Sequence, residues 1–77
     1  MNQAILFNDD ISYQQGELTF TAMASGQLIR CKIATELEQE AAIAHFAQYQ
    51  FDYEMQAEQL IEDEAFNEAG EVSLAFL

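Results

Sequence analysis

Residues 17–34 read ELTFTAMASGQLIRCKIA and carry the most regular pattern in the chain. Apolar side chains alternate with other residues on both sides of a Ser25-Gly26 pair; the apolar positions are Leu18, Phe20 and Ala22, then Ile29, Cys31 and Ile33. A period of two with β-favouring residues is typical of a half-buried strand. The stretch therefore predicts an antiparallel hairpin over residues 17–23 and 27–34, with Arg30 and Lys32 together on its outer face.

Shorter strands are expected on both sides of this hairpin. Residues 4–7 and 11–13 flank a polar turn at residues 8–10 and indicate two short strands. Residues 71–77 alternate again and predict a closing strand, whose apolar positions are Val72, Leu74 and Phe76. Glycine adopts the φ > 0 conformation of turns at little cost, and all glycines of the chain stand between these elements, at Gly16, Gly26 and Gly70.

Residues 36–65 predict a helix. The segment contains no Gly or Pro and is rich in Ala, Glu, Gln and Leu, which are good helix formers. Thr35 followed by Glu38 is the pattern of a capping box, in which the threonine hydroxyl bonds a free backbone N–H of the first turn. We therefore expect the helix to begin directly after Thr35.

Two apolar stripes follow this helix at a spacing of three to four residues. One contains Ile43, Phe46, Ala47, Tyr53, Ala57, Leu60 and Ile61, and it is interrupted at Gln50. The other contains Leu37, Ala41, Ala44, Phe51 and Met55, and on a continuous helix it lies nearly opposite the first. Two arrangements account for this pattern. Either the helix breaks near residues 48–51, or it continues and both sides are covered, by the N-terminal strands or by a second copy of the chain.

Length and composition indicate one domain spanning residues 1–77, with 51% hydrophobic residues to build a core. Cys31 is the only cysteine, which excludes an intramolecular disulfide and fits a reducing compartment. The N-terminus lacks the basic residues and long apolar run of a signal peptide, and no segment is apolar enough to span a membrane. We therefore expect a cytoplasmic protein.

The net charge limits the classes of partner that the chain is expected to bind. Fourteen acidic residues outweigh two basic ones, and the formal net charge is −12. Nucleic acids and anionic membranes are bound chiefly through Lys and Arg, so neither is an expected partner. A strongly acidic surface attracts basic proteins instead.

The acidic residues of the helix form the main candidate site. Glu54, Glu58 and Glu62 follow one another at i, i+4 and i+8 and make a ridge without an intervening Lys or Arg. Three interpretations are open: a solvated face, a docking surface for a basic partner, or a divalent-cation site. Phe51 and Met55 from the second stripe join the ridge as candidate partner-binding residues, or as a surface for self-association.

No constellation in the sequence indicates catalysis. Cys31 is flanked by two cations, but in a strand its neighbours point to the opposite face and do not activate the thiol. His45 is the only histidine, and no Ser-His-Asp arrangement or glycine-rich phosphate loop accompanies it. We predict no catalytic, cofactor-binding or metal-ligating residue, and we do not expect an enzyme.

Several runs of the chain resemble a family of short bacterial proteins, Domain of Unknown Function 1488. The runs that carry the resemblance are Met1–Phe7; Phe20-Thr21-Ala22 with Gly26, Ile29, Cys31 and Ile33; and Phe46, Phe51-Asp52, Ala57-Glu58, Leu60-Ile61, Phe66, Gly70 and Val72. The chain departs from the family pattern at Tyr13, where members often have Trp, and at Tyr49-Gln50, where they have His-Arg. The resemblance implies a small α+β fold and supplies no activity, cofactor or catalytic residue.

The patterns together predict an α+β domain. Four or five short strands form an antiparallel sheet, and a long or broken helix over residues 36–65 packs on one face. The expected function is a non-enzymatic interaction or regulatory module that binds a basic protein through the acidic helix face or forms a homodimer through the second apolar stripe. The alternative is a small-ligand or divalent-metal-binding protein that uses the helix carboxylates.

Overall fold

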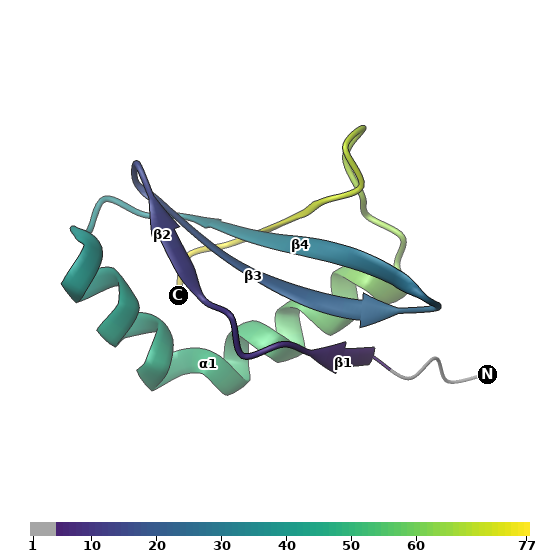
Figure 1. Ribbon diagram of the computed structural model, residues 1–77, viewed down its shortest axis with the longest axis horizontal. Helices are drawn as coiled ribbons and strands as arrows, with labels where there is room; N and C mark the ends of the chain where they lie inside the picture. The colour runs from purple at the N-terminus through teal and green to yellow at the C-terminus, as the bar shows by residue number, and fades with distance from the viewer. Residues whose placement is uncertain (1–4) are drawn as a thin grey trace.

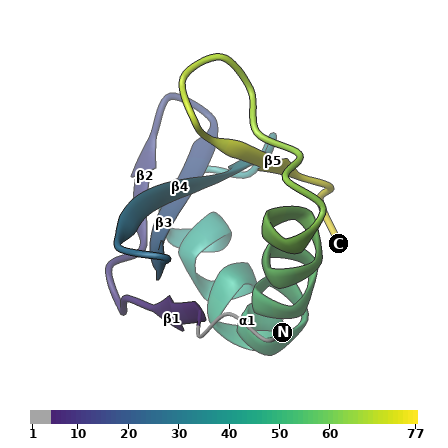
Figure 2. The ribbon, with the colours of Figure 1, turned by 90° about the vertical axis from the view of Figure 1, so that its right-hand side faces the viewer.

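The structure is a computed structural model that describes residues 5–77. Its elements in chain order are β1 (Ile5–Phe7), β2 (Ser12–Gln14), β3 (Glu17–Ala24), β4 (Gln27–Ala34), α1 (Gln39–Glu62) and β5 (Val72–Leu74). The strands form one sheet, and α1 lies across a single face of it (Figures 1 and 2). The predicted α+β class and the placement of the helix are confirmed.

The hairpin of β3 and β4 is the centre of the sheet. The two strands are antiparallel, and Phe20 pairs with Cys31. The register begins with Glu17 opposite Ala34 and ends with Ala24 opposite Gln27. Along both strands the alternate apolar side chains are buried beneath α1, as the alternation predicts. The glycine that precedes β3, Gly16, has a φ of 78° and lies so close to Thr35 that a Cβ would meet its carbonyl oxygen at 3.2 Å. Only glycine fits this turn without strain.

The outer edge of β3 is shared by two short strands. β1 pairs with the half of β3 near Ala24, and β2 pairs with the half near Glu17. Between them the turn at residues 8–10 stays attached, because the Asp10 carboxylate accepts hydrogen bonds from the Thr21 backbone N–H at 3.0 Å and hydroxyl at 2.6 Å. The two predicted strands therefore exist; Ala4, the expected first residue, lies outside the described residues.

The closing strand differs from the prediction in direction and length. β5 covers only Val72–Leu74 and pairs with β4 in parallel, so the sheet is not purely antiparallel. The reason is the connection: α1 carries the chain back along the sheet, and the strand that follows a crossover helix runs parallel to the strand before it. Val72 and Leu74 are buried as expected, whereas Phe76 leaves the strand and stacks on His45 of α1.

The capping box predicted at Thr35 is wrong. Thr35 still belongs to the sheet, because its backbone N–H donates to the Gly16 carbonyl, and its hydroxyl accepts from the Leu37 N–H instead of a helical one. The Leu37 carbonyl is in turn bound by the Tyr13 hydroxyl at 3.0 Å. These bonds hold residues 35–37 in a turn, and the helix begins at Gln39 after Glu38, which makes no side-chain cap.

The helix also ends three residues earlier than predicted, at Glu62. Glu64 adopts a φ of 56°, and the backbone N–H groups of Glu64 and Ala65 bond to the carbonyls of Ile61 and Leu60. This paired pattern is a Schellman motif, which terminates helices through a left-handed residue that is usually glycine. Here a glutamate occupies that position.

A kink in α1 explains how one helix carries two opposed apolar stripes. Tyr49 has non-helical angles, φ −111° and ψ 19°, within the predicted break at residues 48–51. The kink keeps the first stripe on the sheet over both halves of the helix, where its buried members are Phe46, Tyr53, Ala57 and Ile61. From the second stripe only Leu37 packs against the core, and Phe51 and Met55 project into solvent. The first of the two arrangements is therefore confirmed.

Candidate functional site

The solvent side of α1 carries one continuous line of side chains that mixes apolar and acidic residues. Phe51, Met55, Glu58 and Glu62 follow one another at intervals of four, three and four residues, which places them on the same helix face. All four are exposed, and Phe51 and Met55 keep 71% and 55% of their surface in water. Exposed large apolar side chains on one ridge are typical of a contact surface. We call this line the helix ridge.

Glu54, the third predicted member of the acidic ridge, occupies a different position. It is half-buried at the border of the face that packs on the sheet, and its carboxylate accepts a hydrogen bond from Gln50 one turn earlier at 3.1 Å. Gln50, which interrupts the first stripe, thus supports Glu54 beside the kink. The structure therefore brings four of the five predicted partner-binding residues into one line and sets Glu54 beside it.

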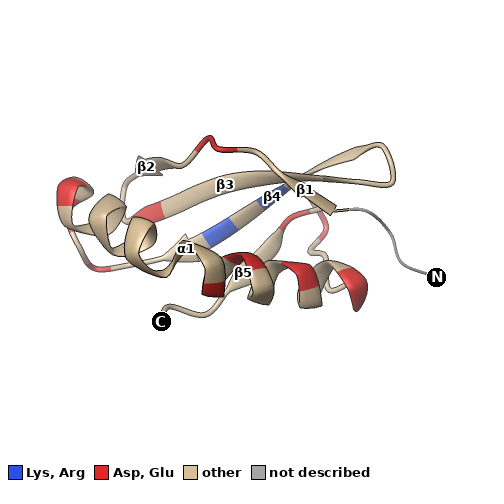
Figure 3. Ribbon diagram, turned by 90° about the horizontal axis from the view of Figure 1, so that it is seen from below, with Lys and Arg blue, Asp and Glu red and all other residues tan. Residues whose placement is uncertain are grey.

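The negative charge of the helix ridge is not neutralised locally. The last turn of α1 contains no basic residue, and the helix C-terminus adds its own partial negative charge. Figure 3 shows acidic residues along α1, while both basic residues lie on β4. Like charges at i and i+4 disfavour a helix by a few tenths of a kcal/mol, so the carboxylates of Glu58 and Glu62 weaken the element that carries them.

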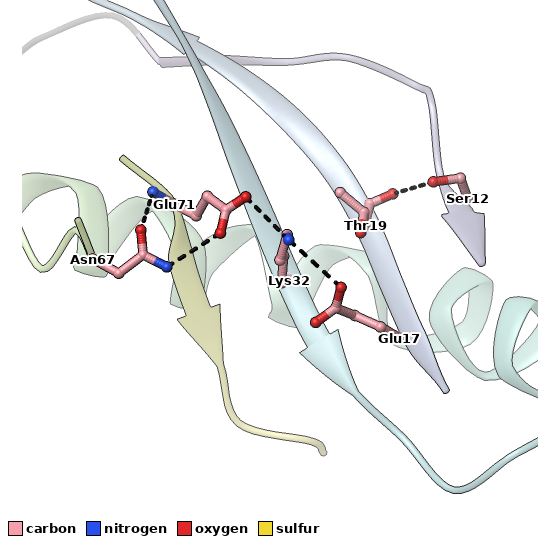
Figure 4. A network of polar contacts seen from close by, with 6 residues as sticks. All are labelled: Ser12, Glu17, Thr19, Lys32, Asn67 and Glu71. Atoms are coloured by element: carbon pink, nitrogen blue, oxygen red, sulfur yellow. Dashed lines mark hydrogen bonds and ion pairs between the residues drawn. The ribbon is translucent and has the colours of Figure 1, made fainter. Parts of the chain in front are cut away.

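Lys32 does not pair with the helix carboxylates. Its ammonium lies 3.0 Å from Glu71 and 3.7 Å from Glu17, on the sheet face away from α1 (Figure 4). Asn67 donates to the other Glu71 oxygen at 3.2 Å and also bonds the Glu71 backbone N–H, which ties the loop before β5 to the sheet. The hydrogen bond from the Asn67 amide, followed by that from Lys32, lowers the pKa of Glu71. The hydrogen bond that Lys32 donates to Glu71 raises the pKa of Lys32.

Cys31 and His45 sit in separate surroundings. Burial, with a smaller effect from Asp10, raises the pKa of the Cys31 thiol to about 12, which leaves it without a thiolate at neutral pH. His45 is half-buried, and its Nε2 lies 2.8 Å from the hydroxyl of Tyr53. No nucleophile–base pair is formed by these two residues in the described part of the chain.

The C-terminal segment is held by side chains that sequence reasoning missed. The Tyr53 hydroxyl accepts from the Leu77 backbone N–H at 2.9 Å, and the Gln56 amide bonds both the N–H and the carbonyl of Ala75. Phe76 stacks on His45 with ring centroids 4.4 Å apart. No local sequence pattern predicts these contacts, because they join residues that are far apart in the chain. Beside them lies a depression of about 510 Å³ lined by Leu37 and Phe76 among other residues.

Two further findings concern ligands and membranes. Within residues 5–77, no three His, Cys, Asp or Glu side chains converge on a point where a metal ion could sit. In the same described part of the chain, no helix combines the length and apolar character needed to cross a bilayer.

These features define a class: a small two-layer α+β protein in which, over residues 5–77, the helix covers one face of the sheet and bears an exposed apolar–acidic ridge. Residues 5–74 match the model of the family described as protein of unknown function (DUF1488), and the chain belongs to this family. It is similar to a crystal structure of a DUF1488 protein of unknown function from Shewanella loihica PV-4, at 34% identity, a TM-score of 0.86 and coverage of 96% of this chain and 94% of that one. No curated protein matches the chain.

Proposed function

We propose that this protein is a non-enzymatic interaction module that binds a basic protein through the helix ridge. The observation that carries the proposal is the single line in which Phe51 and Met55 are followed by Glu58 and Glu62, all exposed. Interfaces commonly combine a buried aromatic or Met anchor with a polar rim that sets orientation. Here the anchor and the rim lie end to end on one helix.

Charge supports a foreign basic partner over the other occupants of this ridge. A second copy would bring Glu58 and Glu62 against the same residues or against other carboxylates of a chain with a net charge of −12. Opposed like charges cost several kcal/mol at an interface. A basic partner would gain attraction over the same distances, and its approach would be steered by the field of the whole protein. The helix-carboxylate metal site has less support, because these carboxylates follow one helix ridge and, in the described residues, no third ligand joins them.

The test is affinity capture from the lysate of the host, at low and high salt, with wild type and with two double variants of the helix ridge. Phe51→Ala/Met55→Ala removes the anchor, and Glu58→Gln/Glu62→Gln removes the charge without changing shape. We expect a partner that wild type retains at low salt to be lost at high salt and with both double variants. Truncating an interface anchor costs about 2 kcal/mol or more, so its affinity should fall roughly thirtyfold.

Leu28→Ala is the matched control, because Leu28 is a comparably exposed apolar residue on the opposite layer, at 57%. It should retain the partner as wild type does. Retention that survives both helix double variants, or that is lost with Leu28→Ala alone, would refute the proposal.

A further inference from the structure

The face of the sheet that points away from α1 is a second surface, and it has a different character from the helix. We call it the open sheet face. It consists of the outward side chains of all strands, Leu6, Ser12, Gln14, Glu17, Thr19, Thr21, Met23, Leu28, Arg30, Lys32, Ala34 and Ser73. Within the described residues no second layer covers it (Figure 2).

The strand register arranges this face in rows that run across the strands. At the end near the β3–β4 turn, Leu6 pairs with Met23 and Met23 with Leu28, which gives an apolar row. Leu6 and Leu28 expose 67% and 57% of their surface. In the next row Thr21 stands between Asp10, whose carboxylate it binds, and Arg30, its partner on β4.

Charge is nearly balanced on the open sheet face, in contrast to the rest of the molecule. The only two basic residues of the chain, Arg30 and Lys32, lie here, and three carboxylates accompany them, from Asp10, Glu17 and Glu71. Lys32 is already paired with two of these, whereas Arg30 has no ion-pair partner among residues 5–77. Of the two exposed faces, only this one could approach another copy of so acidic a chain without strong local repulsion.

We infer that the open sheet face binds a second copy of this chain, sheet against sheet, about a twofold axis parallel to β3. Rotation about this axis brings each row of one copy opposite the same row of the other copy, with the order of the strands reversed. Met23 then meets Met23, Leu28 of one copy meets Leu6 of the other, and Arg30 lies opposite Asp10. The surface is thus self-complementary in its apolar row and in the row of Thr21. Glu17, on the same strand as the axis, meets Glu17 of the other copy and adds to the repulsion between the copies.

The size of the surface predicts a weak and reversible dimer. Four strand widths of about 4.8 Å and eight residues of about 3.3 Å give roughly 500 Å² per copy. The total of roughly 1,000 Å² is at the lower limit for a specific interface. Each copy also repels the other through its net charge of −12. Added salt screens this long-range repulsion. It should therefore strengthen the dimer, whereas it weakens docking of a basic partner on the helix ridge.

The test is sedimentation velocity on the full chain from roughly 10 μM to roughly 1 mM, at low and high salt, a range that brackets weak association. We expect a monomer–dimer equilibrium that shifts toward dimer with concentration and with salt. Leu28→Glu places a charge in the apolar row and should yield a monomer. Phe51→Glu, the matched change on the helix ridge, should leave the equilibrium as in wild type. Far-ultraviolet circular dichroism and a thermal melt verify that both variants fold.

A cross-link distinguishes this geometry from other dimers. Met23→Cys puts a thiol close to the axis, so a short bis-maleimide that spans about 10 Å, the usual spacing of packed sheets, should join two copies through this position. The native Cys31 gives little background because it is buried. Phe51→Cys is the control and should stay monomeric with the same reagent. A wild type that stays monomeric throughout, a Leu28→Glu variant that still dimerises, or cross-linking through Phe51→Cys but not Met23→Cys would overturn the inference.

Discussion

Replacing Tyr53 by Phe removes one oxygen from the place where α1 holds the C-terminal segment. The Tyr53 side chain is fully buried, and its hydroxyl lies 2.8 Å from His45 Nε2 and 2.9 Å from the Leu77 backbone nitrogen. Each neutral hydrogen bond contributes about 0.5–1.5 kcal/mol net, so two give about 1–3 kcal/mol. Leu77 is partly exposed, and water can satisfy its N–H in the variant. We therefore expect Tyr53→Phe to lower the free energy of unfolding by about 1–2 kcal/mol.

Urea unfolding followed by circular dichroism measures this loss, and amide hydrogen exchange reports on Leu77 directly. A loss of 1 kcal/mol lowers the melting temperature by about 4–8 °C in a domain of this size. Tyr13→Phe is the matched control, because its hydroxyl makes one bond, to the Leu37 carbonyl at 3.0 Å. Its loss should be about half as large. Equal stability of Tyr53→Phe and wild type, or unchanged exchange at the Leu77 amide, would show that the hydroxyl does not hold the segment.

Three further predictions test separate parts of the fold. Because burial raises the pKa of Cys31 to about 12, its alkylation at neutral pH should follow the rate of global unfolding; fast labelling of folded protein would contradict this. Glu64→Gly should stabilise the protein by about 0.5–1 kcal/mol in urea unfolding, since glycine adopts the φ of 56° found there without strain, whereas Glu58→Gly inside α1 should destabilise it. Carbon-13 NMR titration should place the Glu71 pKa below its ordinary value, and both Asn67→Ala and Lys32→Met should raise it. A pKa lowered on folding stabilises the protein above the unfolded pKa of about 4.3 and loses this effect as pH falls through the folded value, so the advantage of wild type over Asn67→Ala should shrink in acid.

The sequence was most informative where one residue pattern had a single physical meaning. The alternation over residues 17–34 predicted the hairpin with its β4 bounds intact, because a one-residue slip would turn Ile29, Cys31 and Ile33 out of the core. The two opposed stripes of the helix gave a break near residues 48–51 as one of two open arrangements, and the kink lies at Tyr49. Both signals are local, and neither depends on what packs from elsewhere in the chain.

The errors came from contacts between distant residues. Thr35 has the sequence of a helix cap, but its N–H is bound by Gly16 in the sheet, and this bond delays the helix. Lys32 meets Glu71, whose position depends on the loop fixed by Asn67, so this ion pair does not follow from any local pattern. Of the candidate site, the sequence left open whether Phe51 and Met55 are covered or exposed, and both their exposure and the half-burial of Glu54 depend on how the kinked helix packs.

The parallel pairing of β5 has a consequence for the order of folding. The hairpin of β3 and β4 is joined by a two-residue turn, whereas the pairing of β5 with β4 closes a loop that contains all of α1. Closing so long a loop costs chain entropy before the contacts between the two strands form. Contacts between residues far apart in the sequence therefore slow folding. Yet Val72 and Leu74, in a strand of three residues, fill part of the core. We therefore expect β5 to pair late in folding although it completes the core, and to be the first strand to open when the native protein fluctuates.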